Sequence, residues 1–111
     1  MYTKIKEIIP LLEYICGLPA NEIKPTLQTI KPRMYKFLLD FLLNVMIGKI
    51  LVAKAVKKVL KQYKKIIASI LKKGKSLKRR VRELTEDPGL FRAIFKPLLA
   101  AFHKILKNGT Q

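Results

Sequence analysis

Residues 54–82 contain thirteen lysine or arginine residues and no acidic residue. Up to residue 73, basic and apolar residues alternate at intervals of three and four positions, which is the spacing of an amphipathic helix. We therefore predict a helix with one basic and one apolar side. The basic side comprises Lys54, Lys57, Lys58, Lys61, Lys64, Lys65 and Lys72, and the apolar side Val56, Val59, Leu60, Tyr63, Ile66, Ile67, Ile70 and Leu71.

The charge of the chain is concentrated in its second half. Residues 51–111 contain 17 basic and 3 acidic residues, residues 1–50 contain 7 and 4, and the net charge is +17. Such an excess favours a polyanionic partner, either nucleic acid or an anionic membrane surface. Half of the 111 residues are apolar, which is more than a disordered basic tail would contain. We expect one domain, with a near-neutral packing part (1–50) and a basic part (51–111).

Helical spacing extends over nearly the whole chain, and strand patterns are scarce. We predict an all-α fold of about five helices. The predicted helices cover residues 2–16, 20–30, 33–73, 77–84 and 90–107. Ser76 is expected to cap the fourth of these helices, and Asp87-Pro88-Gly89 to form a turn before the last.

The helix predicted at residues 33–73 would be about 60 Å long. This length exceeds the diameter expected for a compact chain of 111 residues, so one chain could not cover it. We therefore expect self-association to complete the helical bundle, giving a homo-oligomer. Gly48 is the position at which the helix would most easily break.

The segment 37–53 is apolar on every side except for one polar stripe, which indicates burial in a core, in an oligomer interface or in lipid. Asp40 lies on that stripe and is expected to pair with Lys36 or with a lysine of another subunit. The segment is too short and too polar to predict a membrane-spanning helix. The residues predicted for self-association are Phe37, Leu38, Phe41, Leu42, Val45 and Met46.

A lysine-rich helical side suits phosphate contact, because lysine lacks the planar fork with which arginine reads guanine. Exposed aromatic residues interleaved with basic ones, as in single-strand binders, are missing, so duplex is favoured. The Gly74 turn resembles the joint of a helix-turn-helix, but the helix after it has no Asn or Gln to read adenine. The predicted nucleic-acid-binding residues are Lys54, Lys57, Lys58, Lys61, Lys64, Lys65, Lys72, Lys73, Lys75, Lys78, Arg79, Arg80 and Arg82.

Catalytic and metal-binding patterns are absent from the sequence. His103 is the only histidine and has no ligand partner nearby in sequence, so we predict a surface polar residue. The single cysteine, Cys16, is expected to be a small buried hydrophobe. The seven acidic residues form no catalytic pair. We predict no enzyme activity, no cofactor, no metal and no small-molecule substrate.

These patterns favour a structural protein that coats or condenses duplex nucleic acid without strong sequence specificity. The chain resembles the small, all-helical, basic nucleoproteins and coat proteins that wrap genomes in viruses of hyperthermophilic archaea. The resemblance lies in size, helical content and enrichment in lysine and isoleucine, and it assigns no role to a single residue. It implies a virion or nucleocapsid role. The N-terminus carries no secretory signal pattern, so we expect a virion or an intracellular, nucleoid-associated location.

The alternative is a cationic, membrane-active helical protein of the bacteriocin or toxin type. Basic amphipathic helices also lie on anionic bilayers, and such a protein would insert apolar side chains such as Phe95 and Phe102. The absence of tryptophan counts against this alternative, because tryptophan is enriched at membrane interfaces.

Overall fold

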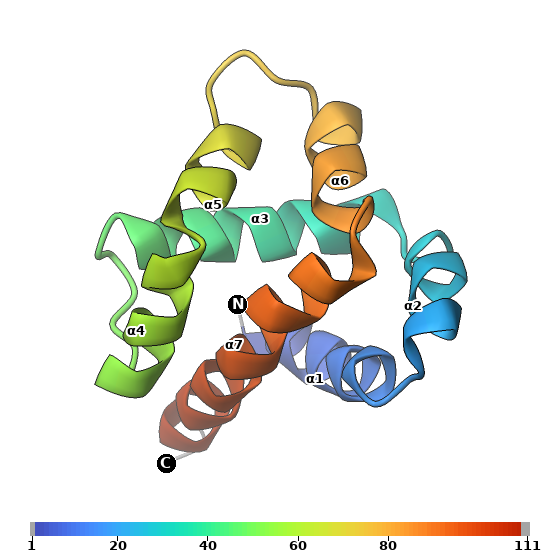
Figure 1. The fold of residues 1–111 in the computed structure, drawn as a ribbon. Coiled ribbons are helices and arrows are strands. Elements are labelled where there is room, and N and C mark those ends of the chain that lie inside the picture. Colours follow the sequence, from blue (N-terminus) through green and yellow to red (C-terminus); the bar gives the residue numbers. More distant parts are fainter. Residues whose placement is uncertain (1, 110–111) are drawn as a thin grey trace.

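The computed structural model describes residues 2–109, which form seven α-helices and no strand (Figure 1). The predicted all-α class is confirmed, whereas the predicted number of about five helices is too low. The molecule measures 37 × 27 × 24 Å along its principal axes. The helices are α1 (Tyr2–Cys16), α2 (Ala20–Leu27), α3 (Pro32–Met46), α4 (Lys54–Gln62), α5 (Lys64–Ile70), α6 (Leu77–Thr85) and α7 (Pro88–Gly109).

The first and last helices form the most extensive helix pair of the fold, so the two ends of the sequence meet in one core (Figure 1). Apolar residues on α1 recur every three or four positions and turn one side of that helix inward. On α7 the same spacing brings large aromatic and aliphatic side chains to the interior. The side chains of these two helices with no exposed surface are Ile5, Ile8, Leu12, Ile15, Phe91, Ile94, Phe95, Leu98 and Phe102.

Aromatic rings join α3 to α7. The ring centroids of Phe41 and Phe102 lie 4.3 Å apart, and Phe37 stands 6.1 Å from Phe102 and 6.2 Å from Phe41. Rings at such distances pack in offset or tilted pairs, which stabilise a core beyond the burial of their area. This cluster holds α3 against the pair of α1 and α7.

A buried hydroxyl fixes the start of α3 against the end of α2. The Tyr35 hydroxyl donates a hydrogen bond to the carbonyl of Leu27, and the Tyr35 side chain is almost completely buried. Burial raises the pKa of Tyr35 to about 12, because the charged phenolate would lose its hydration.

The helix predicted at residues 33–73 is wrong beyond Met46. Gly48 has a φ of +85°, which glycine adopts without steric cost, and this conformation turns the chain out of α3. The carbonyl of Asn44 accepts hydrogen bonds from the backbone N–H groups of Lys49 (2.8 Å) and Ile50 (3.1 Å), which closes the helix end. A second interruption, at Tyr63, separates α4 from α5, so the basic helix is two short helices.

The starts of α6 and α7 are each capped by a side chain. The Ser76 hydroxyl accepts a hydrogen bond from the backbone N–H of Arg79 (3.2 Å), as predicted for the start of α6. Asp87-Pro88-Gly89, predicted as a turn, instead begins α7. A carboxylate oxygen of Asp87 accepts from the N–H of Gly89 (2.9 Å), and Pro88 is the first helical residue, where its missing N–H costs nothing.

Candidate nucleic-acid interface

Helix α4 has the two-sided character that its sequence predicts. Its apolar residues Val56 and Leu60 are buried, and the helix packs against α7. The lysines of α4 occupy the opposite, exposed side. Burial of the apolar side therefore orients the charged side toward solvent.

Helix α5 continues this arrangement after the interruption at Tyr63. Ile67 and Ile70 are buried, and Lys64 and Lys65 are exposed. Ile66, predicted on the apolar side, is 46% exposed. The backbone leaves the helical conformation at Tyr63 (φ −107°, ψ 14°). The prediction for Ile66 assumed one continuous helix through this residue.

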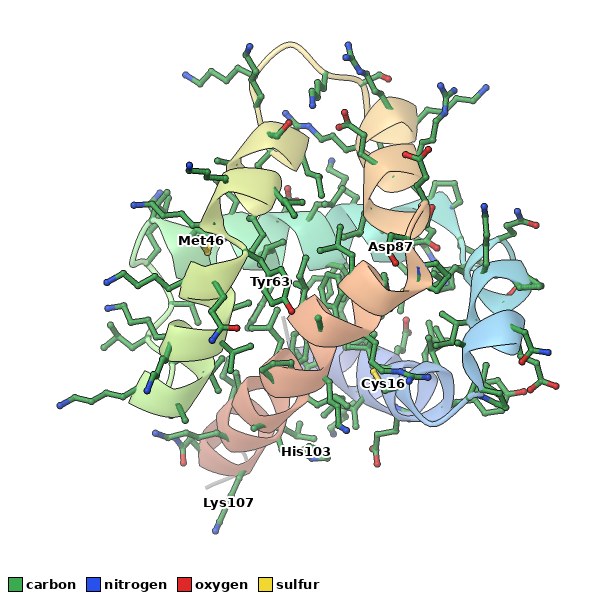
Figure 2. All side chains as sticks on the ribbon, viewed as in Figure 1. Cys16, Met46, Tyr63, Asp87, His103 and Lys107 are labelled. Carbon is green, nitrogen blue, oxygen red and sulfur yellow. The ribbon has the colours of Figure 1, made fainter. Side chains whose placement is uncertain are left out.

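Eleven of the thirteen predicted nucleic-acid-binding residues are exposed, and we call them the basic surface. Figure 2 shows nitrogen-tipped side chains extending outward from α4, α5, the loop after α5, and α6. No acidic residue lies between residues 54 and 82 to offset this charge. The basic surface consists of Lys54, Lys57, Lys58, Lys61, Lys64, Lys65, Lys72, Lys73, Lys78, Arg79 and Arg82.

Lys75 is held inside the protein and does not belong to the basic surface. Its Nζ lies 2.8 Å from Oε2 of Glu83 and donates to the carbonyl of Ser69 at 2.6 Å. Only 10% of the Lys75 side chain is exposed. The hydrogen bond from Lys75 lowers the pKa of Glu83, partial burial opposes this, and the charges of Lys75 and Arg79 reinforce it.

Arg80 has a similar role on the other side of the turn between α5 and α6. Its Nη2 donates to the carbonyl of Lys72 at 3.1 Å, and the side chain is half-buried. Together with the ion pair of Lys75 and Glu83, this contact ties α6 to the end of α5. No sequence pattern could have predicted either contact. The partners lie eight positions apart across a turn, whereas side chains that contact each other along one helix are three or four positions apart.

Four of the six residues predicted for self-association lie in the core of the single chain. Leu38 and Leu42 have no exposed surface, and Phe41 and Val45 are 2% and 7% exposed. Phe37 and Met46 are half-buried against the same core. Because the turn at Gly48 lets the chain cover most of the apolar side of α3 itself, these side chains do not form a continuous surface for a second copy of the protein. Self-association remains a prediction, but these six residues no longer support it.

The polar stripe of α3 faces solvent, and Asp40 is exposed on it. Three of the five large hydrophobic side chains with substantial exposure in the described residues lie at or after the end of this helix: Leu43 is 39%, Ile47 56% and Leu51 87% exposed. The other two, Tyr14 and Ile66, lie on α1 and α5. Ile47 and Leu51 belong to the connection between α3 and α4, beside Lys49. The sequence pattern did not indicate this connection, because residues 47–53 fit the helical spacing predicted for 33–73.

His103 and Cys16 lie away from the basic surface. His103 is exposed, as predicted, and its Nε2 stands 3.7 Å from a carboxylate oxygen of Glu13 on α1. Burial raises the pKa of the half-buried Cys16 thiol, and the nearby charges of Arg92 and Lys96 oppose this. Across residues 2–109, no group of three or more His, Cys, Asp or Glu side chains could hold a metal ion.

Comparison with protein-family models, curated proteins and solved structures found no significant match. In the part of the chain that the structure describes, every helix is too short or too polar to cross a membrane.

Proposed function

We propose that this protein binds duplex nucleic acid through the basic surface and coats or condenses it without strong sequence specificity. The observation that carries the proposal is the set of eleven exposed cationic side chains on three consecutive helices and the loop between α5 and α6, uninterrupted by any acidic residue. In a mixed-charge surface, neighbouring carboxylates would cancel such a field. On the basic surface the positive charges reinforce one another, and their combined field attracts a polyanion.

The kinds of residue on the surface favour backbone contact over base reading. Nine of the eleven are lysines, whose ammonium groups act as point charges toward phosphate. The two arginines, Arg79 and Arg82, lie on α6 only. Phosphate contacts fix position on a duplex and carry no sequence information. A role as a virion nucleoprotein or a chromatin-like protein fits such binding.

Helices α4 and α5 bring lysines close together, and their mutual repulsion opposes the folded state. A bound polyanion removes that repulsion and binds the folded chain in preference to the unfolded one. Duplex binding should therefore raise the thermal stability of the protein.

The decisive experiment reverses two charges in the basic surface. Lys57→Glu plus Lys61→Glu should abolish duplex binding in fluorescence anisotropy, because two attractive contacts on α4 become repulsive. Both side chains are exposed, so the circular dichroism spectrum should keep its helical form. The matched control is Lys24→Glu plus Lys31→Glu, which changes the net charge equally at exposed positions outside the basic surface. An equal loss in both proteins, or no loss in the first, contradicts the proposal.

A salt series measures how many phosphates are contacted. If six to ten are neutralised, affinity should fall by about 10³ to 10⁵ between 50 and 200 mM salt. A flat salt dependence would contradict a phosphate-contact mechanism.

Membrane-surface binding is the second candidate, and the exposed connection after α3 favours it. Leu51 and Ile47 stand out from the protein beside Lys49 and Lys54. Phe95 and Phe102, the side chains expected to enter a bilayer, have no exposed surface and belong to the core. Anionic liposomes added to the anisotropy assay separate the candidates, since a membrane protein would leave the duplex for the liposomes.

A further inference from the structure

A hollow of about 380 Å³ lies between the end of α3 and α4. Its volume falls at the lower end of the range of pockets that hold small ligands, roughly 300–1,000 Å³. Figure 2 labels Met46, which stands where α3 ends beside the junction of α4 and α5. The residues that line the hollow are Val45, Met46, Lys54, Lys57, Lys58, Leu60, Lys61 and Lys64.

The lining combines two chemistries. Its apolar part comes from Val45 and Leu60, which belong to the core, and from the half-buried thioether of Met46. A thioether on an unbranched side chain adapts its shape to different apolar partners. The five lysines are exposed, so their apolar stems extend the wall while their ammonium groups reach water.

No acidic residue lines the hollow, and apart from the lysines it has no polar side chain. A nucleobase or a sugar would therefore find neither an aromatic ring to stack on nor an acceptor for its own donors. An alkyl chain would find apolar contact, and an anionic group at its end would meet several cations. The lining thus matches a ligand with one apolar end and one negative end.

We propose that this hollow binds a single-chain anionic amphiphile, with the alkyl chain against Val45, Met46 and Leu60 and the anionic head among the lysines. Fatty carboxylates and single-chain phospholipids share this chemistry. The site goes beyond the proposed nucleic-acid function and does not depend on it. Only one consequence rests on that function: because Lys57 and Lys61 belong to both sites, the amphiphile should weaken duplex binding.

The first test is a ligand series measured by isothermal titration calorimetry with the whole chain, below the concentrations at which each ligand aggregates. From butyrate to octanoate to laurate, affinity should rise roughly three- to fourfold per methylene while the chain is being buried. Dodecanol has the chain of laurate without its charge and should bind at least about fivefold more weakly. If butyrate binds as well as laurate, or dodecanol as well as laurate, the proposal is wrong.

The second test fills the hollow without changing charge. Met46→Trp places a larger side chain at the apolar wall, and laurate affinity should fall by at least tenfold, roughly the loss of two buried methylenes. The natural chain contains no tryptophan, so the new indole also reports on the fold by its fluorescence. Unchanged laurate affinity in a folded Met46→Trp protein would place the ligand elsewhere and overturn the assignment.

A pair of charge variants decides the matter even if Met46→Trp does not fold. Lys54→Gln plus Lys58→Gln removes two cations from the rim of the hollow, and Lys72→Gln plus Lys73→Gln removes two exposed cations of the basic surface that do not line it. The first pair should weaken laurate binding at least about fivefold and the second should leave it unchanged. Equal effects would show attraction to the overall charge and no site.

Duplex binding should fall in both charge variants, so a failure of the nucleic-acid function is seen separately from a failure of this site. Vesicles of phosphatidylglycerol distinguish the ligand's source. Uptake of laurate from loaded vesicles identifies a bilayer as a source, and uptake of dissolved laurate alone identifies a free fatty acid; both support the site. Binding to vesicles without any binding of dissolved laurate overturns it and assigns this side of the molecule to the membrane surface.

Discussion

The helices α1, α3 and α7 and the helices α4 to α6 use their apolar residues differently. In the first group, nearly every inward position is filled by a large side chain, and rings from α3 and α7 interlock. In the second group, only a few apolar residues per helix are buried. These are Val56 and Leu60 on α4, Ile67 and Ile70 on α5, and Leu84 on α6.

Because of this difference, the stability of the fold and the basic surface depend on different helices. The first group has enough buried apolar surface to determine the fold, because stabilisation grows with the area removed from water. The second group carries the basic surface and is attached by limited apolar contact together with the ties of Lys75 and Arg80. Substitutions in the first group should therefore affect the whole molecule, whereas those in the second should remain local.

The largest loss of stability should come from Phe102→Ala. The Phe102 ring has no exposed surface and contacts both Phe37 and Phe41, so its removal should lower the free energy of unfolding by about 3–5 kcal/mol. Urea denaturation measures the change. Leu51→Ala, at a position 87% exposed, serves as the control and should change the free energy by less than about 0.5 kcal/mol. Similar losses in the two variants would contradict the division described above.

Tyr35→Phe tests the attachment of α2 to α3. The variant leaves the buried carbonyl of Leu27 with only the longer hydrogen bond from the N–H of Ile30 (3.4 Å), which should lower the free energy of unfolding by about 1–3 kcal/mol. Urea denaturation at neutral pH measures the loss. A loss near zero would mean that water replaces the hydroxyl at this position.

The alkaline stability of the protein should depend on the same hydroxyl. Its pKa is raised from 10.0 to about 12 in the folded state, so the stabilisation is complete below pH 10 and is lost as pH rises toward 12. The two proteins differ in no other titratable group. The natural protein should therefore lose more stability than Tyr35→Phe between pH 10 and 12, as thermal melts across that range would show. Parallel pH profiles would contradict this.

A smaller effect is expected from Ser76→Ala at the start of α6. The N–H of Arg79 loses its acceptor, which should cost about 1 kcal/mol. Ser76→Asp should retain the cap and with it most of the stability. Hydrogen exchange should show faster opening of α6 in Ser76→Ala and unchanged protection of α1 and α7. Uniformly faster exchange would mean that the basic helices and the core unfold as one unit.

The smallest effect should come from Glu83→Gln, which removes the ion pair with Lys75. Because the pKa of Glu83 is lowered in the folded state, its stabilisation is present above its ordinary value of 4.5 and is lost as pH falls through the lower folded value. The difference in melting temperature between the natural protein and Glu83→Gln should therefore shrink below pH 4.5. A difference that persists in strong acid would contradict an ionic origin.

Features set by neighbouring residues could be predicted from the sequence. The end of α1 before Gly17, the cap at Ser76 and the two-sided character of α4 all depend on spacing within a few positions. Contacts between distant parts of the chain could not be predicted. Tyr35 bonds to the end of the preceding helix, Lys75 to Glu83 across a turn, and His103 approaches Glu13 from the other end of the chain. Helical periodicity contains no information about such pairs.

The end of α3 also depends on a contact between distant residues, which periodicity cannot predict. Periodicity favoured one helix through Gly48, and glycine inside a helix costs only about 1 kcal/mol. The packing of α4 against α7 outweighs that local preference, and the left-handed conformation of Gly48 then becomes the point where the chain turns. The connection 47–53 and the hollow next to it exist because of this turn, so helical periodicity could predict neither.

Under the proposed function, the turn at Gly48 also determines how many copies of this protein a duplex can carry. A straight helix of 33–73 would have been a rod that needs overlapping neighbours, whereas the folded chain is a closed unit whose greatest dimension is 37 Å. Each unit can lie on a duplex without sharing a helix with the next, and it spans at most about eleven base pairs at 3.4 Å per pair. The number of copies that saturate a duplex is then the length of the duplex divided by the width of one unit.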